Sequence, residues 1–229
     1  MKKRICIFFL LTVFSVGFLS AKVKLTLDVG PVYTYFSSRT TINSESKTKW
    51  ATHTGGLNVL FGAEFVQNFG VYGTVNFAFG QKIIDVTTIG NNRSKTITIA
   101  RWNGDLTYVI DSQFGFFYVF HPVKKLDLTL GAGIGIGGSG RNYTYTELGV
   151  RKKAAISQAN IGGGINFTAS YMFTKMVGIY GGVSQTFYAP VSTTSRTKVG
   201  NETTETTNSS ASGKFAHSFN IKAGIQLVF

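Results

Sequence analysis

The chain has 229 residues, a net charge of +13 and a single cysteine, Cys6. An intrachain disulfide is therefore excluded, and the length fits one domain. Residues 1–21 hold three of the 23 basic residues and none of the 10 acidic ones, so the rest of the chain carries a net charge of +10.

Residues 1–21 predict a cleaved secretory signal peptide. Three basic residues at 2–4 precede an apolar run over 5–19, which ends at Ser20-Ala21. A basic start, a short apolar centre and a small residue at the cut define such a signal, whereas a membrane-spanning helix needs about 20 apolar residues. Cys6 begins the apolar run and does not end it, so we expect no lipid anchor. Residues 22–229 then form one domain.

The rest of the chain alternates with a period of two. In eight segments, one face is mostly apolar and holds no Asp, Glu, Lys or Arg: 23–35, 57–65, 71–79, 106–120, 126–136, 157–173, 177–187 and 217–229. Successive side chains of a strand point to opposite faces, so each segment predicts a strand. The complementary faces carry the charges Lys24, Asp28, Glu64, Asp111, Asp127 and Lys222.

This pattern favours a membrane barrel over a soluble one. A soluble barrel is apolar inside, whereas a charge on the lipid face at mid-membrane costs about 2–4 kcal/mol. We therefore predict an all-β fold, an eight-stranded antiparallel up-and-down transmembrane β-barrel, which leaves no unpaired backbone edge in lipid. Aromatic residues near both ends of the strands predict two interfacial girdles.

The connections alternate in length. Those around Asn68, at 121–124 and at 174–176 are short, whereas 37–53, 83–104, 139–156 and 190–214 are expected to be long polar loops. Short periplasmic turns and long outer loops are typical of outer-membrane barrels. Most of the excess basic charge falls on the long connections.

With these features the chain resembles the small eight-stranded outer-membrane proteins, the class of outer-membrane proteins W, A and X. It is also similar to small surface barrels of spirochaetes. The resemblance rests on the signal, the alternation and the last strand, whose apolar face includes Phe219, Ile221, Ile225, Leu227 and Phe229. A strand that ends in Phe resembles the signal read by the barrel assembly machinery. The resemblance implies location in the outer membrane, with its lipid as a partner.

Two apparent chemical motifs are set aside. Residues 133–138 contain G-x-G-x-x-G, but the segment that follows reads as a loop, and 153–160 hold no acidic residue for a dinucleotide. Glycines 131, 133, 135 and 137 are instead expected either to make room inside the barrel for Tyr72, Phe117, Tyr180 and Tyr188 or to let the strand bend. The three histidines are scattered, so we expect no metal, no cofactor and no enzyme activity. No nucleic acid partner is expected.

The interior charges predict a functional cluster. Asp28 and Lys222 are expected at similar depth on the strands that close the barrel, with Glu64 close by and Asp111 also facing inward. They form either a salt-bridged plug or the constriction of a narrow pore. Three apolar residues, Val32, Leu60 and Val109, are expected to line the lumen as well.

Two functions follow from these expectations. The first is a small channel for passive passage of small solutes, apolar ones included, for which outer-membrane protein W is the family precedent. The alternative is a non-conducting surface barrel, an adhesin or polyanion-binding protein, whose basic outer loops attract host or envelope polyanions.

Overall fold

A computed structural model describes residues 23–43, 46–90, 93–97, 106–147, 149–200, 202–208 and 215–229. The predicted signal, 1–21, lies outside the described residues. The strands are β1 (Lys24–Asn43), β2 (Ser46–Val66), β3 (Phe69–Gly90), β4 (Arg93–Ile97), β5 (Thr107–Val123), β6 (Leu126–Glu147), β7 (Val150–Met172), β8 (Val177–Val199), β9 (Glu202–Asn208) and β10 (Phe215–Val228).

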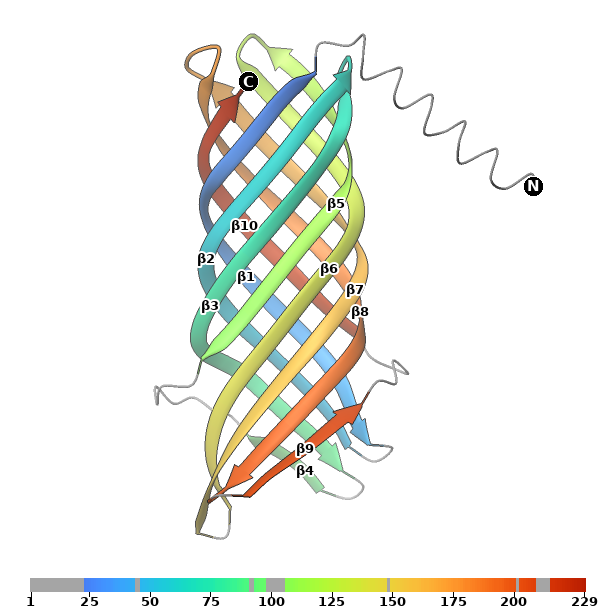
Figure 1. Cartoon of the computed structure of the whole chain (residues 1–229), viewed down its shortest axis with the longest axis vertical. Coiled ribbons are helices and arrows are strands. Elements are labelled where there is room, and N and C mark those ends of the chain that lie inside the picture. The colour runs from blue at the N-terminus through green and yellow to red at the C-terminus, as the bar shows by residue number, and fades with distance from the viewer. Residues whose placement is uncertain are drawn as a thin grey trace, which may run out of the picture.

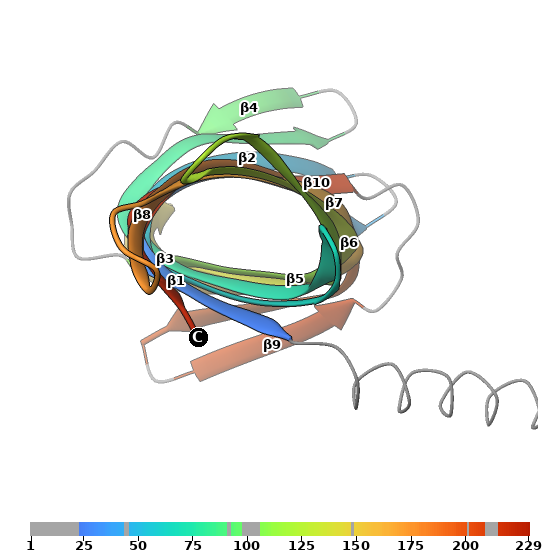
Figure 2. The same cartoon turned by 90° about the horizontal axis from the view of Figure 1, so that it is seen from above.

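Eight long antiparallel strands close into a barrel, which confirms the predicted fold (Figures 1 and 2). The ring runs β1, β2, β3, β5, β6, β7, β8 and β10, and β10 pairs with both β8 and β1. At the closure, Leu25 N donates to Phe229 O at 3.3 Å, and Phe229 N donates to Leu25 O at 2.9 Å. The C-terminal residue thus takes part in the pairing that closes the ring.

Tight turns join the strands at the end of the barrel that holds the C-terminus (Figure 1). Asn68 has φ of 68° in the β2–β3 turn, and Lys125 has φ of 74° in the β5–β6 turn. Asn tolerates this left-handed conformation well, because its short polar side chain bonds locally. By the rule for outer-membrane barrels, these turns face the periplasm.

The expectation of long loops at the other end was wrong for much of their length. β1 continues to Asn43, and β2 already begins at Ser46. Likewise β7 begins at Val150, and β8 continues to Val199. The short strands β4 and β9 add to the ends of β3 and β8. Where their side chains are described, the inward positions of these extensions include small or polar residues such as Ser38, Ala154 and Thr193, so the extensions lack the apolar alternation that reveals a half-buried strand. Their Thr-rich composition is nevertheless suited to strands.

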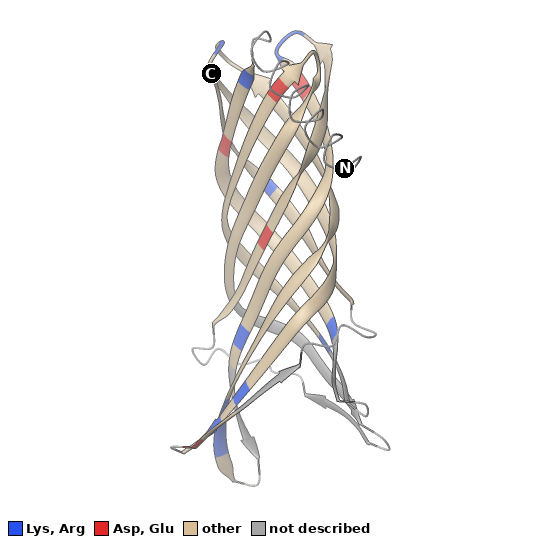
Figure 3. Ribbon diagram, turned by 45° about the vertical axis from the view of Figure 1, so that its right-hand side comes forward, with Lys and Arg blue, Asp and Glu red and all other residues tan. Residues whose placement is uncertain are grey.

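Exposed apolar side chains form a belt around the barrel wall. They include Phe61, Phe79, Phe114, Phe116, Ile134, Ile165, Ile179 and Ile225. Figure 3 shows that charged residues gather mainly at the two ends, with few between them. Those described in the middle of the wall, Asp28, Asp111 and Lys222, are buried inside. A surface of this kind is stable in contact with lipid chains.

Aromatic rings mark both borders of the belt. On the outer side, Tyr35 contacts the rings of His53 and His217, with centroids 5.1 and 5.8 Å away. On the turn side, Phe69 stacks on Phe116 at 5.7 Å, and Tyr118 meets Phe120 edge-on at 4.7 Å. Amphipathic and aromatic rings favour the membrane interface, as the two predicted girdles require. Among the described residues, no helix is long and apolar enough to cross a membrane.

Candidate functional site

A buried carboxylate, Asp111 on β5, collects hydrogen bonds in the middle of the barrel. Asn220 Nδ2 donates to its Oδ2 at 2.6 Å, and Thr186 Oγ1 donates to its Oδ1 at 3.3 Å. Tyr188 Oη and Ser218 Oγ also donate to the two oxygens. The side chain of Asp111 is fully buried, and four donors satisfy a charge that would otherwise be costly there.

These bonds cross the lumen. β5 and β10 lie four strands apart in either direction around the ring, yet Asp111 on β5 is bonded directly to Ser218 and Asn220 on β10. Gln113 on β5 likewise donates to Thr186 on β8. Side chains from opposite walls therefore bond one another across the interior, as expected of a barrel only wide enough for side chains to fill.

A second polar centre forms around Asn58 on β2. Its Nδ2 donates to Thr74 Oγ1 at 2.9 Å and to Asn76 Oδ1 at 2.7 Å. Its Oδ1 accepts from Tyr180 Oη on β8 at 2.9 Å. This second bridge spans the lumen from β2 to β8. Polar networks with paired members are rigid, because breaking one bond leaves a buried group unsatisfied.

An apolar cluster packs on the outer side of Asp111. Its members are Phe36, Trp50, Val109, Tyr188 and Ala216. Phe36 and Trp50 lie with ring centroids 5.1 Å apart, and the Arg141 guanidinium sits 4.7 Å from the Trp50 ring centroid, a cation–π contact. Tyr188 joins the two layers, because its ring is in this cluster and its hydroxyl bonds Asp111.

Glycines on β6 provide the space for these large side chains. A Cβ added at Gly131 would lie 2.8 Å from the Tyr72 ring, and one at Gly137 would lie 2.9 Å from Tyr188 Oη. The structure thus agrees with the sequence interpretation of these glycines for Tyr72 and Tyr188. Tyr180 instead lies against Gly224 of β10, and Phe117 against Gly62 and Gly70.

The four predicted charged residues do not form one salt-bridged cluster, although the Lys222 ammonium is attracted by both Asp28 and Asp111. Asp28, Asp111 and Lys222 are buried inside the barrel, but Asp28 is opposite Gln226 in register, and Lys222 is opposite Val32. Among the described residues, no ion pair joins Asp28 to Lys222. The expected similar depth was wrong, because the pairing of Phe229 with Leu25 offsets the two residues by four positions.

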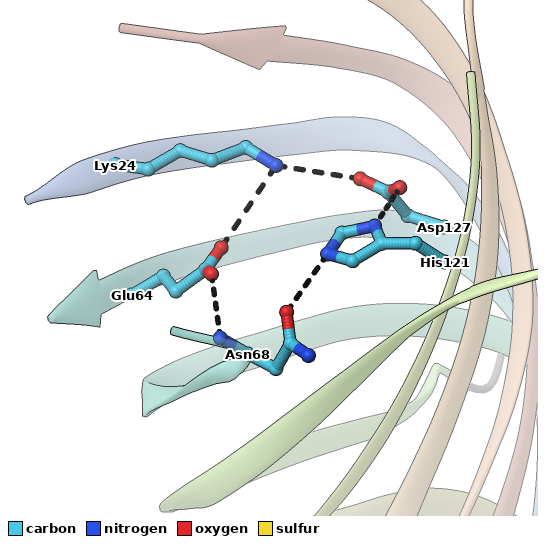
Figure 4. Close-up of polar contacts among 5 residues, drawn as sticks. All are labelled: Lys24, Glu64, Asn68, His121 and Asp127. Carbon is cyan, nitrogen blue, oxygen red and sulfur yellow. Dashed lines mark hydrogen bonds and ion pairs between the residues drawn. The ribbon is translucent and has the colours of Figure 1, made fainter. Parts of the chain in front are cut away.

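Glu64 lies farther away, at the periplasmic mouth (Figure 4). Its Oε2 is 3.9 Å from Lys24 Nζ, and its Oε1 accepts from Asn68 N at 2.9 Å. Lys24 Nζ also donates to Asp127 Oδ2 at 3.3 Å, and His121 Nδ1 lies 2.6 Å from Asp127 Oδ1. This mouth cluster connects β1 and β2 to β5 and β6 across the ring.

The predicted apolar lining is also dispersed. Val109 belongs to the outer apolar cluster, Leu60 lines a cavity on the periplasmic side, and Val32 is buried opposite Lys222. All three side chains are buried in packing. They do not form a continuous apolar path through the lumen.

The C-terminal strand presents its predicted apolar face. Ile221, Ile225 and Phe229 are exposed on the wall, and Phe219 and Leu227 are partly exposed on the same face. Recognition of this face by the assembly machinery stays a prediction.

Sequence reasoning missed the uncharged hydrogen-bonding partners of Asp111. Their position on the inward faces was the available signal, but their pairing across the ring depends on register.

A basic surface lies on the outward face of the β7–β8 extension. Lys153 and Lys198 are directly opposite each other in register, and both are exposed. Arg151 lies two residues from Lys153 on the same face, while Ala154 between Lys153 and Ala155 points inward and is buried. We call Arg151, Lys153 and Lys198 the basic face. Arg196 extends it toward the membrane, opposite Glu205 of β9.

A β-bulge is what aligns these residues. The register shifts at Ala159 and Asn160, which pair with Ser192 and Pro190, so one extra residue lies on β8. Below the bulge the odd residues of β8 face outward, and beyond it the even residues do, including Lys198. A second like-charged pair, Arg39 of β1 and Lys49 of β2, is also exposed and directly opposite in register.

Among the described residues, no group of three or more His, Cys, Asp or Glu side chains could hold a metal ion.

The closed ring, the apolar belt and the polar interior define the class of protein: this is an outer-membrane β-barrel. Two solved structures share the fold. The outer membrane protein OprG from Pseudomonas aeruginosa has a TM-score of 0.55 and 11% identity, over 91% of this chain and 97% of that chain. A major outer membrane protein from Thermus thermophilus has a TM-score of 0.58 and 14% identity, over 87% of this chain and 99% of that chain.

Within that class, the chain belongs to the family described as "Domain of unknown function (DUF2715)", whose model matches residues 17–229. No curated protein matches the chain. At these identities the two solved structures show the fold alone, so the function has to be argued from the side chains.

Proposed function

We propose that the protein is a non-conducting surface barrel that binds anionic polysaccharide through the basic face. The observation that carries the proposal is the direct pairing of Lys153 with Lys198 on exposed neighbouring strands. Like charges directly opposite on a sheet are destabilising. A sulfate or carboxylate group held between them would offset that repulsion.

Several features support this choice over a solute channel. The basic face stands on an extension beyond the barrel, where a large polymer could reach it. Arg39 and Lys49 supply a further basic pair on the outward surface. The lumen, in contrast, is crossed by hydrogen bonds around Asp111 and Asn58. The channel hypothesis therefore requires this network to open, whereas polymer binding requires no rearrangement. The proposal includes no catalytic step.

Immobilised heparin, a sulfated polysaccharide, provides a direct test with full-length protein refolded in detergent. Wild type should bind at low salt and be released as salt rises, because the Debye length falls from about 10 Å at 0.1 M to about 3 Å at 1 M. The double variant Lys153→Ser/Lys198→Ser should bind about tenfold more weakly, a loss of about 1.4 kcal/mol.

The matched control removes two exposed lysines at the opposite end, in the variant Lys124→Ser/Lys175→Ser. It carries the same net charge as the first double variant, so it should keep wild-type binding if the position of the charge matters. Equal weakening in both variants would mean that heparin responds to net charge alone, and the proposed site would be rejected.

A further inference from the structure

A narrow cavity lies inside the barrel on the periplasmic side, behind the mouth cluster. It is separate from the basic face, which is at the other end of the strands. One wall is apolar and includes Leu60, Phe117 and Val119. The remaining lining is polar and comes mainly from β1, β2, β6 and β7.

The charge of this cavity is unbalanced. Its lining includes three carboxylates, Asp28, Glu64 and Asp127, and one ammonium, that of Lys24. Lys24 Nζ lies between Glu64 and Asp127, at 3.9 and 3.3 Å from their oxygens (Figure 4). The mouth carboxylates therefore share one cation. Asp28 lies deeper. Among the described residues no cation lies within 4.0 Å of its carboxylate, and the buried Lys222 ammonium attracts it only from farther away.

Buried acceptors in the wall lack donors. Asp28 Oδ1, Asn166 Oδ1 and Thr168 Oγ1 are buried and make no hydrogen bond, and all three residues line the cavity. Asp28 is only 1% exposed, and its neighbour Gln226 bonds the carboxylate from one side alone. An unsatisfied buried polar group costs about 1–3 kcal/mol, more when it is charged. A ligand that brings hydrogen-bond donors and positive charge would remove that cost.

The spacing of the carboxylates selects the shape of such a ligand. They are too dispersed to form a metal site, as no described group of three acidic or histidine side chains could hold one. Lys24, which is opposite Glu64, lies four residues before Asp28 on β1. At about 3.3 Å per residue, the two levels are roughly 13 Å apart along the strand. A flexible alkyl chain with an ammonium group at each end spans that distance and can lie along the apolar wall.

We propose that this cavity binds a linear polyamine. One terminal ammonium would donate to Asp28, the chain would lie against Leu60 and Phe117, and the other ammonium would reach Glu64 and Asp127 at the mouth. The two terminal charges would balance the excess of carboxylates over Lys24. The middle ammonium of a triamine such as spermidine would face the polar lining, where Asn166 Oδ1 and Thr168 Oγ1 are buried without a donor. Lys24 would then compete with the ligand for the mouth carboxylates.

Spermidine is the probe, with calorimetry on the full chain refolded in a zwitterionic detergent. Wild type should bind one spermidine, and Asp28→Asn should weaken binding roughly tenfold or more, because a charge-assisted hydrogen bond is lost. Ethylenediamine, which cannot span the two levels, should bind weakly. Glu202→Gln, at an exposed acidic residue at the other end, is the matched control and should bind as wild type does.

The variant Lys24→Gln gives a test in the opposite direction, since removal of the competing ammonium should tighten spermidine binding. If Asp28→Asn fails to fold, Lys24→Gln and Glu64→Gln replace it as the test variants. The proposal is overturned if wild type does not bind spermidine, or if Mg²⁺ or ethylenediamine binds as tightly as spermidine does. Unchanged affinity in Asp28→Asn, or in both Lys24→Gln and Glu64→Gln, would overturn it as well.

Discussion

Asp111 accepts four of the hydrogen bonds that cross the lumen. Its two carboxylate oxygens accept from Thr186, Tyr188, Ser218 and Asn220, which come from β8 and β10. Each of these donors is buried, so each depends on this acceptor or on another partner. Asn220 has one such alternative, because it also donates to Ser184 Oγ at 3.2 Å. Thr34 Oγ1 in turn donates to Asn220 Oδ1 at 2.6 Å, which extends the network to β1.

Removal of this carboxylate should therefore destabilise the barrel. We expect Asp111→Ala to lower the free energy of unfolding by about 3 kcal/mol or more, because several buried donors lose their acceptor at once. Asp111→Asn retains one acceptor oxygen and should lose less. Urea unfolding in detergent micelles measures both. The exposed variant Glu202→Ala is the control, and equal stability of Asp111→Ala and the control would refute this role for Asp111.

At the residue scale the sequence revealed which charges face inward but not their partners. The period-two pattern identified Asp28, Asp111 and Lys222 as interior residues, and their side chains are buried. Which residues they meet depends on strand register, and register is set by backbone pairs such as Leu25 with Phe229. A shift of four residues along one strand separates Asp28 from Lys222 without changing either face.

At the scale of one element, β6 shows how small residues shape the interior. Gly135 faces inward beneath Thr186 and Tyr188, and a Cβ added there would lie 2.3 Å from Thr186 Cγ2. Thr186 cannot move away without cost, because it bonds both Asp111 and Gln113. Gly138, on the other face of the same strand, has no atom nearer than 3.9 Å to such a Cβ.

These two glycines give a matched pair of substitutions. Gly135→Ala should cost about 1–3 kcal/mol of unfolding free energy through overpacking. Gly138→Ala should stay within about 0.5 kcal/mol of wild type. Equal effects in chemical unfolding would mean that the glycines of β6 do not provide space for the side chains of β8.

The strand extensions belong to the same scale, and the sequence analysis placed loops there. An apolar alternation reveals a strand only when its buried face is apolar, whereas the buried positions in these extensions include small or polar residues such as Ala154 and Thr193. Hydrogen exchange distinguishes paired strands from loops in this part of the chain. Residues 152–158 of β7 pair with residues 193–199 of β8, so their backbone amides should exchange slowly. Complete exchange within the dead time, while amides of 161–171 stay protected, would favour loops.

At the scale of the whole molecule, most of the architecture could be predicted from the sequence. The eight uncharged faces gave the number of ring strands, their order and their orientation, because antiparallel neighbours joined by short turns leave little choice of topology. The function was harder to predict from the sequence. The closure of the lumen depends on hydrogen bonds between strands distant in sequence, and the basic face depends on a bulge near Asn160 that shifts β8 by one residue.

The two proposals place binding at opposite ends of a closed barrel. The basic face would hold an anionic polysaccharide outside the cell, while the acidic cavity would hold a polyamine on the periplasmic side. Between them lie the Asp111 and Asn58 networks and the outer apolar cluster. On these two proposals the barrel wall would serve as a membrane anchor with two separate binding surfaces, and nothing would have to pass from one to the other.

Planar-bilayer recording on the refolded full-length protein tests this closure most directly. With Asp111 bonded across the lumen, we expect no discrete conductance steps from wild type at moderate voltage. Asp111→Ala, if it inserts, serves to show whether loss of the network admits ions. Reproducible single-channel steps from the wild-type barrel would contradict the closed lumen and restore the channel hypothesis.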